Sequence, residues 1–108
     1  MATIATQQIK QNGTAPTYAA ASGGGDEFTP GNHVFFHLKN GGGSSVTATF
    51  VTPGTAFGQP IADVAVTVGA GTDQMIGPFP AEEFKGNDGL VAVTYSAVTT
   101  VTVAVLTT

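Results

Sequence analysis

The chain contains no cysteine among its 108 residues. This absence excludes disulfide bonds, thiolate catalysis, and zinc or iron–sulfur sites that cysteine ligates. It also fits a reducing compartment, where structural disulfides are rare.

Charge is the next scarce quantity. Charged residues make up 9% of the chain, against roughly 25% in ordinary soluble domains. The only basic side chains are three lysines, Lys10, Lys39 and Lys85, and the net charge is -4. Nucleic-acid and anionic-membrane binding both need a basic patch, which three scattered lysines cannot form. We therefore expect neither a nucleic-acid nor a membrane partner.

Long hydrophobic runs are also missing. No apolar stretch approaches the roughly 20 residues that span a bilayer. The opening MATIATQQIK has no basic region followed by an apolar run, so we expect no secretory signal. Small and β-branched residues take the place of charge and predict a folded chain. Its surface is then either simply weakly charged or covered by other protein, because interface cores are depleted in charge.

The dominant pattern is an alternation of apolar and polar residues with period two, which is typical of half-buried strands. In the first predicted strand, Val34, Phe36 and Leu38 share one face, while Phe35 and Lys39 lie on the other. The predicted strands are 33–39, 46–51, 63–68, 90–95 and 100–106, with weaker candidates at 2–10, 15–20 and 73–77. Glycine- and proline-rich turns separate them, including 23–26, 29–32, 40–44, 52–54, 69–71 and 87–89.

This spacing predicts an all-β fold: a single antiparallel β-sandwich, jelly-roll-like, of about seven or eight short strands. Residues 26–108 form the expected sandwich. Residues 1–25 hold few large aliphatic side chains. They are expected to form either an N-terminal arm that pairs with a neighbouring protein or the first, loosely packed strands of the sandwich itself.

One helical turn is predicted at 80–84, where Pro80 occupies a tolerated first position and two glutamates follow. Phe84 ends this turn and is expected to cap the core, because so short a helix needs a buried apolar contact. Phe28, Phe57 and Phe79 also fall in predicted loops or turns. Such aromatic residues either cap the ends of the sandwich or anchor a partner.

His33 and His37 are the only histidines and lie four residues apart, the spacing of many helical metal sites. On a strand, however, four steps separate them by about 13 Å. Zinc–nitrogen bonds are about 2.0–2.1 Å long, so one ion cannot bind both side chains. The run Val-Phe-Phe is β-prone and ends at Asn-Gly-Gly-Gly, which favours the strand. We expect no metal site here.

The remaining chemistry-bearing residues form no recognised catalytic pattern. Asp26, Glu27 and Asp88 lie in glycine-rich segments, where solvated loop acids are favoured over weak calcium ligands. The adjacent Glu82 and Glu83 diverge on a helical turn and do not form a glycosidase pair. The glycine runs lack the ending of a phosphate loop, and the serines lack the context of a nucleophile elbow. We expect no enzyme activity, no catalytic residue and no cofactor.

Four segments carry a family resemblance. They are Pro16-Thr-Tyr-Ala-Ala-Ala-Ser-Gly-Gly-Gly-Asp26, Phe35-Phe-His-Leu-Lys-Asn-Gly-Gly-Gly43, Ile76-Gly-Pro-Phe-Pro80 and Val93-Thr-Tyr-Ser-Ala-Val-Thr-Thr-Val-Thr-Val103. Together they resemble the small β-rich proteins encoded among the head genes of tailed bacteriophages, some of which are capsid decoration (cement) proteins. The similarity spans nearly the whole chain and lies in its strands and turns.

The resemblance implies a homo-oligomeric virion protein, with a trimer as the favoured assembly, on the outer surface of the capsid. It would be made in the host bacterial cytoplasm. Its expected partners are the major capsid protein and copies of itself, with no small-molecule substrate. The residues expected at an interface are Ile4, Ile9, Phe35, Phe57 and Phe79.

Two alternatives remain open at this point. The first is another virion component, such as a head fibre base or a tail or connector accessory. The second is a carbohydrate-binding β-sandwich, which would require exposed aromatic platforms. Tryptophan is absent, and Tyr18 and Tyr95 are the only tyrosines.

Overall fold

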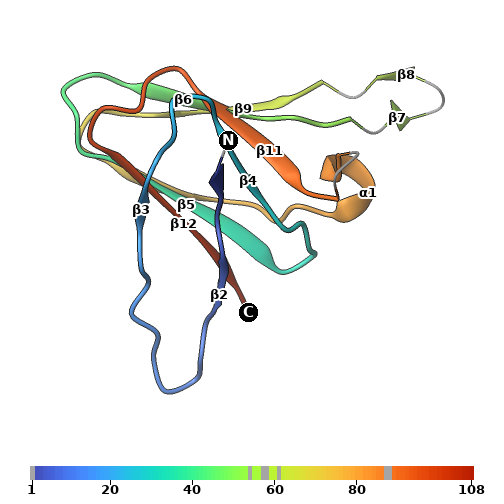
Figure 1. The fold of residues 1–108 in the computed structure, drawn as a ribbon, viewed down its shortest axis with the longest axis horizontal. Helices are drawn as coiled ribbons and strands as arrows, with labels where there is room; N and C mark the ends of the chain where they lie inside the picture. The colour runs from blue at the N-terminus through green and yellow to red at the C-terminus, as the bar shows by residue number, and fades with distance from the viewer. Residues whose placement is uncertain (1, 54, 57–58, 61, 87–88) are drawn as a thin grey trace.

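A computed structural model describes residues 2–53, 55–56, 59–60, 62–86 and 89–108. Two sheets pack face to face, so the predicted β-sandwich is confirmed (Figure 1). The first sheet has the order β1 (Ala2–Thr3), β4 (Asp26–Phe28), β11 (Val91–Tyr95), β6 (Val46–Phe50), β9 (Val64–Val68). The second has the order β10 (Asp73–Ile76), β5 (Val34–Asn40), β12 (Val101–Thr107), β2 (Thr6–Gln8), and β3 (Ala19–Ala20) also pairs with β12.

The five main predicted strands correspond to β5, β6, β9, β11 and β12, each beginning within one residue of its predicted start. The predicted faces also hold for β5, where burial alternates and Val34, Phe36 and Leu38 are buried. The long antiparallel pairing of β5 with β12 places Val105 opposite Phe36 and Val103 opposite Leu38. Alternating side chains of these two strands therefore form one wall of the core.

β4 lies where a turn and loop were predicted, which corrects the sequence-based assignment of Phe28. Its three residues pair with β11, and Phe28 is buried in the middle of the sandwich rather than in a loop. The acidic pair Asp26-Glu27 conceals this strand in the sequence. Asp26 is only 1% exposed, so the prediction of a solvated loop acid was wrong for this residue.

The N-terminal residues pair with the chain's own sheets. β1 runs parallel to β4 in the first sheet, and β2 runs parallel to β12 in the second. The intervening residues, Ile4 and Ala5, therefore cross from one sheet to the other, and Ile4 packs against the core. This crossing closes one side of the sandwich, while the turn between β9 and β10 joins the sheets on the other.

Five phenylalanines form the centre of the core. Phe28, Phe36, Phe50 and Phe79 are almost completely buried, and their ring centroids are 4.8–6.3 Å apart in tilted or edge-on pairs. Phe84 extends the cluster, with its ring 5.1 Å from that of Phe79. Edge-to-face pairs of this kind add to the stabilisation from burial alone.

The segment between β10 and β11 closes the end of the sandwich near this cluster. Helix α1 (Ala81–Phe84) forms the predicted turn, and its buried residue is Phe84, which confirms the expected core cap. Gly77 brings the segment close to β5: its φ is +145°, and a Cβ there would lie 2.7 Å from the carbonyl oxygen of Val34. A side chain at this position would therefore force the two segments apart.

Strands β6 and β9 continue beyond the core as a two-stranded ribbon (Figure 1). The short hairpin β7 (Thr55–Ala56) and β8 (Gln59–Pro60) lies at its end. The carboxylate of Asp63 accepts hydrogen bonds from the backbone N–H and hydroxyl of Thr52, which tie the two strands together. Along β9, the exposed fraction rises from 0% at Val68 to 38% at Val64, so the strand leaves the core as it enters the ribbon.

Candidate functional site

A chain of polar side chains crosses the outer face of the second sheet. The Tyr18 hydroxyl and His37 Nδ1 are 2.6 Å apart, and His37 Nε2 lies 2.6 Å from the Asp73 carboxylate. The Lys39 ammonium lies 4.0 Å from the centroid of the Tyr18 ring. A carboxylate can only accept, so Nε2 donates to Asp73, and Nδ1 of a neutral His37 then accepts a hydrogen bond from the Tyr18 hydroxyl. These side-chain contacts hold the segment before β3 against β5 and β10.

The two histidines lie in different environments. Both ring nitrogens of His37 already have partners, whereas His33 lies exposed in the turn before β5. The sequence placed His37 on a strand but gave no sign of its partners, because Asp73 is 36 positions away. Within the part of the chain that the structure describes, no three acidic or histidine side chains gather as a metal-ligating group.

A second polar pair lies inside the sandwich. The Tyr95 hydroxyl donates a 2.7 Å hydrogen bond to Oδ2 of Asp26, and the Ser22 backbone N–H approaches the same oxygen at 3.3 Å. Burial, and after it the hydrogen bond and negative charge of Asp26, raises the pKa of Tyr95. Tyr95 therefore remains a neutral hydrogen-bond donor. Sequence analysis missed this pair, because nothing local connects the two residues.

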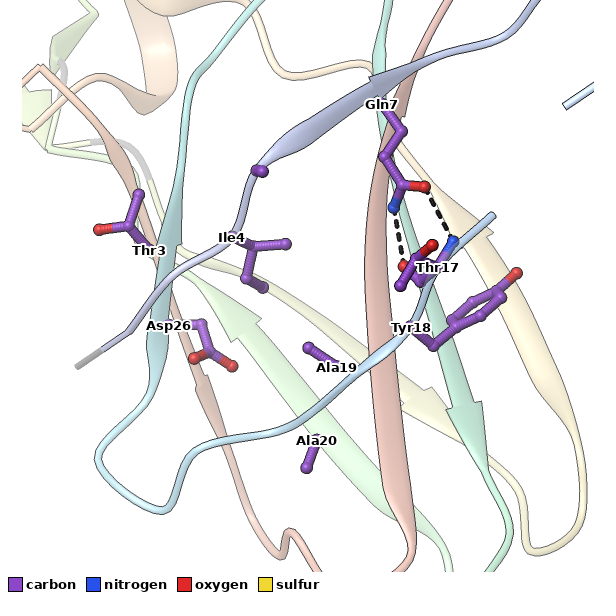
Figure 2. A pocket seen from close by; sticks show the side chains of 9 residues that line it. Thr3, Ile4, Gln7, Thr17, Tyr18, Ala19, Ala20 and Asp26 are labelled. Atoms are coloured by element: carbon purple, nitrogen blue, oxygen red, sulfur yellow. Dashed lines mark hydrogen bonds between the residues drawn. The ribbon is translucent and has the colours of Figure 1, made fainter. Parts of the chain in front are cut away.

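Asp26 also lines a cavity of about 360 Å³ between the N-terminal crossing and β3. Its other walls include Ile4, Ala5, Ala19 and Ala20. Figure 2 shows the Asp26 carboxylate directed toward the space beside Ile4 and Ala19, while the Tyr18 ring points away from it. Thr3, Gln7 and Thr17 complete the lining, so the cavity is a mostly apolar space with a carboxylate on one wall.

Gln7 closes one end of this cavity. Its side-chain amide accepts a 2.8 Å hydrogen bond from the Thr17 N–H and donates a 2.7 Å bond to the Thr17 carbonyl, as the dashed lines in Figure 2 show. Both polar atoms of the Gln7 amide are therefore occupied. The contact joins β2 to the segment before β3, which sets the width of the cavity.

The outer edge of β9 is a third candidate site. On β6, Thr47 accepts a hydrogen bond from Ser96 N–H, and Val51 N–H donates to Ala92, so the alternate residues 47, 49 and 51 face β11. The residues between them then face β9, where Phe50 pairs with Val64 and Ala48 with Val66. In an antiparallel ladder, the intervening residues Ala65 and Thr67 direct their backbone groups to the free side.

A side chain from β10 supports this orientation. The Gln74 amide donates a 3.3 Å hydrogen bond to the Thr67 carbonyl, which therefore points away from β6. Further along, a groove of about 330 Å³ runs beside Val64 and is lined by Ile76, Pro78 and Pro80, with Glu83 among its residues. Gln74 occupies the Thr67 carbonyl, and the backbone groups of Ala65 remain on the free side of β9. A strand edge beside an apolar groove is the arrangement that binds an extended segment by strand addition.

The residues expected at an interface are distributed over different environments. Ile9 is 43% exposed just after β2, and Phe35 is half-buried on the outer face of β5. Ile4 packs against the core from the N-terminal crossing. Phe79 is 1% exposed and belongs to the core, so it is not accessible to a partner, while Phe57 lies outside the described residues. Among the described residues, the structure does not bring Ile4, Ile9, Phe35 and Phe79 together.

Comparisons of the chain with protein-family models, with curated proteins and with solved structures found no match. Among the described residues, no helix has the length and apolar character needed to cross a membrane.

Proposed function

We propose that the protein is a non-enzymatic virion component, a capsid decoration (cement) protein that binds an assembled head shell and stabilises it. The sequence resemblance suggests the role, and the outer edge of β9 is the observation that supports it. A decoration protein needs a surface that joins to other protein rather than a site that transforms a substrate. Ala65 offers such a surface through its outward N–H and carbonyl, and Thr67 through its outward N–H, since the Thr67 carbonyl already accepts from Gln74.

The composition of β9 favours protein contact at this edge. Solvent-exposed edge strands are usually protected by lysine, proline or a bulge. The strand Val64–Val68 contains neither charge nor proline. The groove beside Val64 would accept apolar side chains of an added strand, and backbone hydrogen bonds would supply affinity. The occupant we propose is an extended segment of the major capsid protein.

Stabilisation follows from mass action. A protein that binds the assembled shell and not its separated subunits stabilises the shell by about 2.7 kcal/mol per site at a free concentration of 100 Kd. Several linked contacts raise the effective affinity further. A homo-oligomer, such as the trimer implied by the resemblance, would supply those contacts.

A sedimentation experiment tests the proposal. Undecorated heads would be assembled from the major capsid protein encoded in the same genome, mixed with increasing amounts of the purified chain, and separated on a density gradient. We expect the chain to saturate the heads at a fixed ratio per capsid subunit and to raise their disruption temperature. Separated capsid subunits serve as the control and should not bind.

Two results would overturn the proposal. One is the absence of the chain from the head fraction at saturating concentration. The other is saturable binding to purified tails or connectors instead of heads, which would assign the chain to another part of the virion.

A further inference from the structure

We propose that the cavity beside Asp26 binds an alkylammonium group, the chemical group of a lysine side chain or of a free primary alkylamine. This inference does not depend on the capsid role proposed above. It rests on the cavity walls, on the unused oxygen of Asp26 and on the shape of the space between them.

The carboxylate of Asp26 is buried but only half used. Both hydrogen bonds that the structure gives this side chain, from Tyr95 and from Ser22, end on Oδ2. Among the described residues, every side-chain nitrogen or oxygen that is sealed from solvent has a hydrogen-bond partner. No described residue donates a hydrogen bond to Oδ1 of Asp26, so this oxygen is not among the sealed atoms. The space that it faces is the cavity that Asp26 lines.

A half-paired carboxylate in a low-dielectric space attracts a cation strongly. Burying a charge is costly unless it is paired, and burial weakens the screening that water provides. Asp26 is 1% exposed, and among the described residues it is the only ionisable side chain lining the cavity apart from Tyr18. Figure 2 shows the Tyr18 ring directed elsewhere. Among the described lining residues, a bound cation would thus meet one negative group and no positive one.

The apolar walls select for an alkyl stem. Ile4, Ala5, Ala19 and Ala20 line the space, which has a volume of about 360 Å³. A chain of four or five methylenes ending in an ammonium buries its stem on such walls while the charged end reaches a polar group. The amide of Gln7 is held by Thr17 and is not available to a ligand.

The geometry of the acceptor favours ammonium over guanidinium. A guanidinium binds a carboxylate best through two parallel hydrogen bonds to both oxygens. At Asp26, Oδ2 is occupied by Tyr95 and Ser22, so a single oxygen is left. An ammonium acts as a compact point charge and needs only one such acceptor. The chain's own Lys39 is engaged elsewhere, over the Tyr18 ring.

Titration of the isotope-labelled protein with n-pentylamine, followed by NMR, tests the inference. We expect saturable shifts of the backbone amides of Asp26, Ala19 and Ala20 and of the Ile4 methyl groups. The matched probes are 1-pentanol, which keeps the stem without charge, pentanoate, which reverses the charge, and n-butylguanidine. 1-Pentanol and pentanoate should bind at least about tenfold more weakly, the effect expected for losing a charge-assisted hydrogen bond. n-Butylguanidine should also bind more weakly than n-pentylamine, because Oδ2, which its second hydrogen bond would need, is occupied.

Two variants separate binding from folding. Asp26→Asn keeps an acceptor for Tyr95 but removes the charge, and it should weaken n-pentylamine binding roughly 10- to 100-fold. Ala19→Leu keeps the carboxylate and fills the cavity, and it should also abolish the shifts. A thermal melt of each variant confirms that it is folded. If Ala19→Leu is folded and still gives wild-type shifts, the site is elsewhere and the inference is overturned.

The same titration with a doubly capped lysine, acetylated at its α-amine and amidated at its carboxyl group, distinguishes the two sources of the group. Binding of the capped lysine at the same residues assigns the cavity to a protein partner's lysine. Binding of n-pentylamine alone assigns it to a free amine. Equal binding of 1-pentanol and n-pentylamine, or no saturable shift with any amine, would overturn the inference.

Discussion

The Tyr95 hydroxyl donates a 2.7 Å hydrogen bond to the buried carboxylate of Asp26 across 69 positions of sequence. The bond joins β11 to β4, two strands that also pair through their backbones. The bond gives the Asp26 carboxylate a hydrogen-bond donor, which the side chains lining the cavity do not provide. It also helps to keep Tyr95 protonated. The pair therefore links the stability of the fold to the charge at the cavity.

Replacing Tyr95 tests this link through the pH dependence of stability. Tyr95→Phe removes one donor from a buried carboxylate and should lower the free energy of unfolding by about 1–3 kcal/mol at neutral pH. We expect urea denaturation to show this loss with an unchanged m-value. Tyr18→Phe is the matched control, because its hydroxyl contacts His37 on the outer face and should cost less.

The sign of the pH effect follows from the raised pKa of Tyr95. In the unfolded chain this tyrosine loses its proton near its ordinary pKa of about 10, while in the folded protein it remains protonated to higher pH. Its contribution is complete below about pH 10 and declines as the pH rises further. Tyr95→Phe should remove this part of the decline. An unchanged slope above pH 10 would contradict the assignment.

The aromatic core makes Phe84 a sensitive position. Phe84 is 6% exposed and packs edge-on against Phe79. Phe84→Ala should cost about 3–5 kcal/mol, since it leaves a cavity at the end of the sandwich. Calorimetry should show a sharply lower melting temperature. Phe35→Ala, on the outer face of β5, should lower it much less, and equal losses would argue against the core cap.

Gln7 should matter more than its polarity suggests. Its amide makes two hydrogen bonds to the backbone of Thr17, so Gln7→Ala should release the segment before β3. We expect faster hydrogen exchange for amides of residues 17–20 and a loss of about 1–2 kcal/mol in stability. Gln8→Ala is the control, because Gln8 is exposed and its carbonyl, not its side chain, accepts the bond from Thr14. Similar exchange rates in both variants would contradict this role.

The histidines give a prediction about metal. Both ring nitrogens of His37 are occupied by Tyr18 and Asp73, and His33 lies in a separate turn. Purified protein dialysed against zinc should therefore retain no stoichiometric metal. Elemental analysis that found about one tightly held zinc per chain, lost in His37→Ala, would contradict the strand interpretation of this pair.

The sequence predicted those parts of the fold that have a local signal. Alternation along 33–39 and 100–106 identified β5 and β12, because each strand buries one face. β4 carries no such signal, since the buried Asp26 depends on Tyr95, which is far away in sequence. The parallel pairings of β1 with β4 and of β2 with β12 have no local signal either, because they depend on which strands lie at the sheet edges. The candidate sites were missed for the same reason: each combines distant segments.

Alternate residues of β9 direct their backbone groups either to β6 or to the free edge. Substitutions at neighbouring positions can therefore disturb folding and association separately. The Ala65 N–H points to the free side, so Ala65→Pro removes no hydrogen bond to β6, and proline is tolerated at such edge positions. The neighbouring Val66 pairs with Ala48 and faces β6. Val66→Pro should therefore disrupt the ladder and destabilise the fold.

We expect Ala65→Pro to unfold close to the wild-type temperature and to lose binding to the assembled heads, because proline blocks the addition of a strand at that edge. Val66→Pro should melt much earlier whether or not heads are present. Wild-type binding by a folded Ala65→Pro variant would exclude strand addition at β9 as the mode of attachment. It would leave the capsid role itself to the sedimentation experiment, since other surfaces of the sandwich would then have to make the contact.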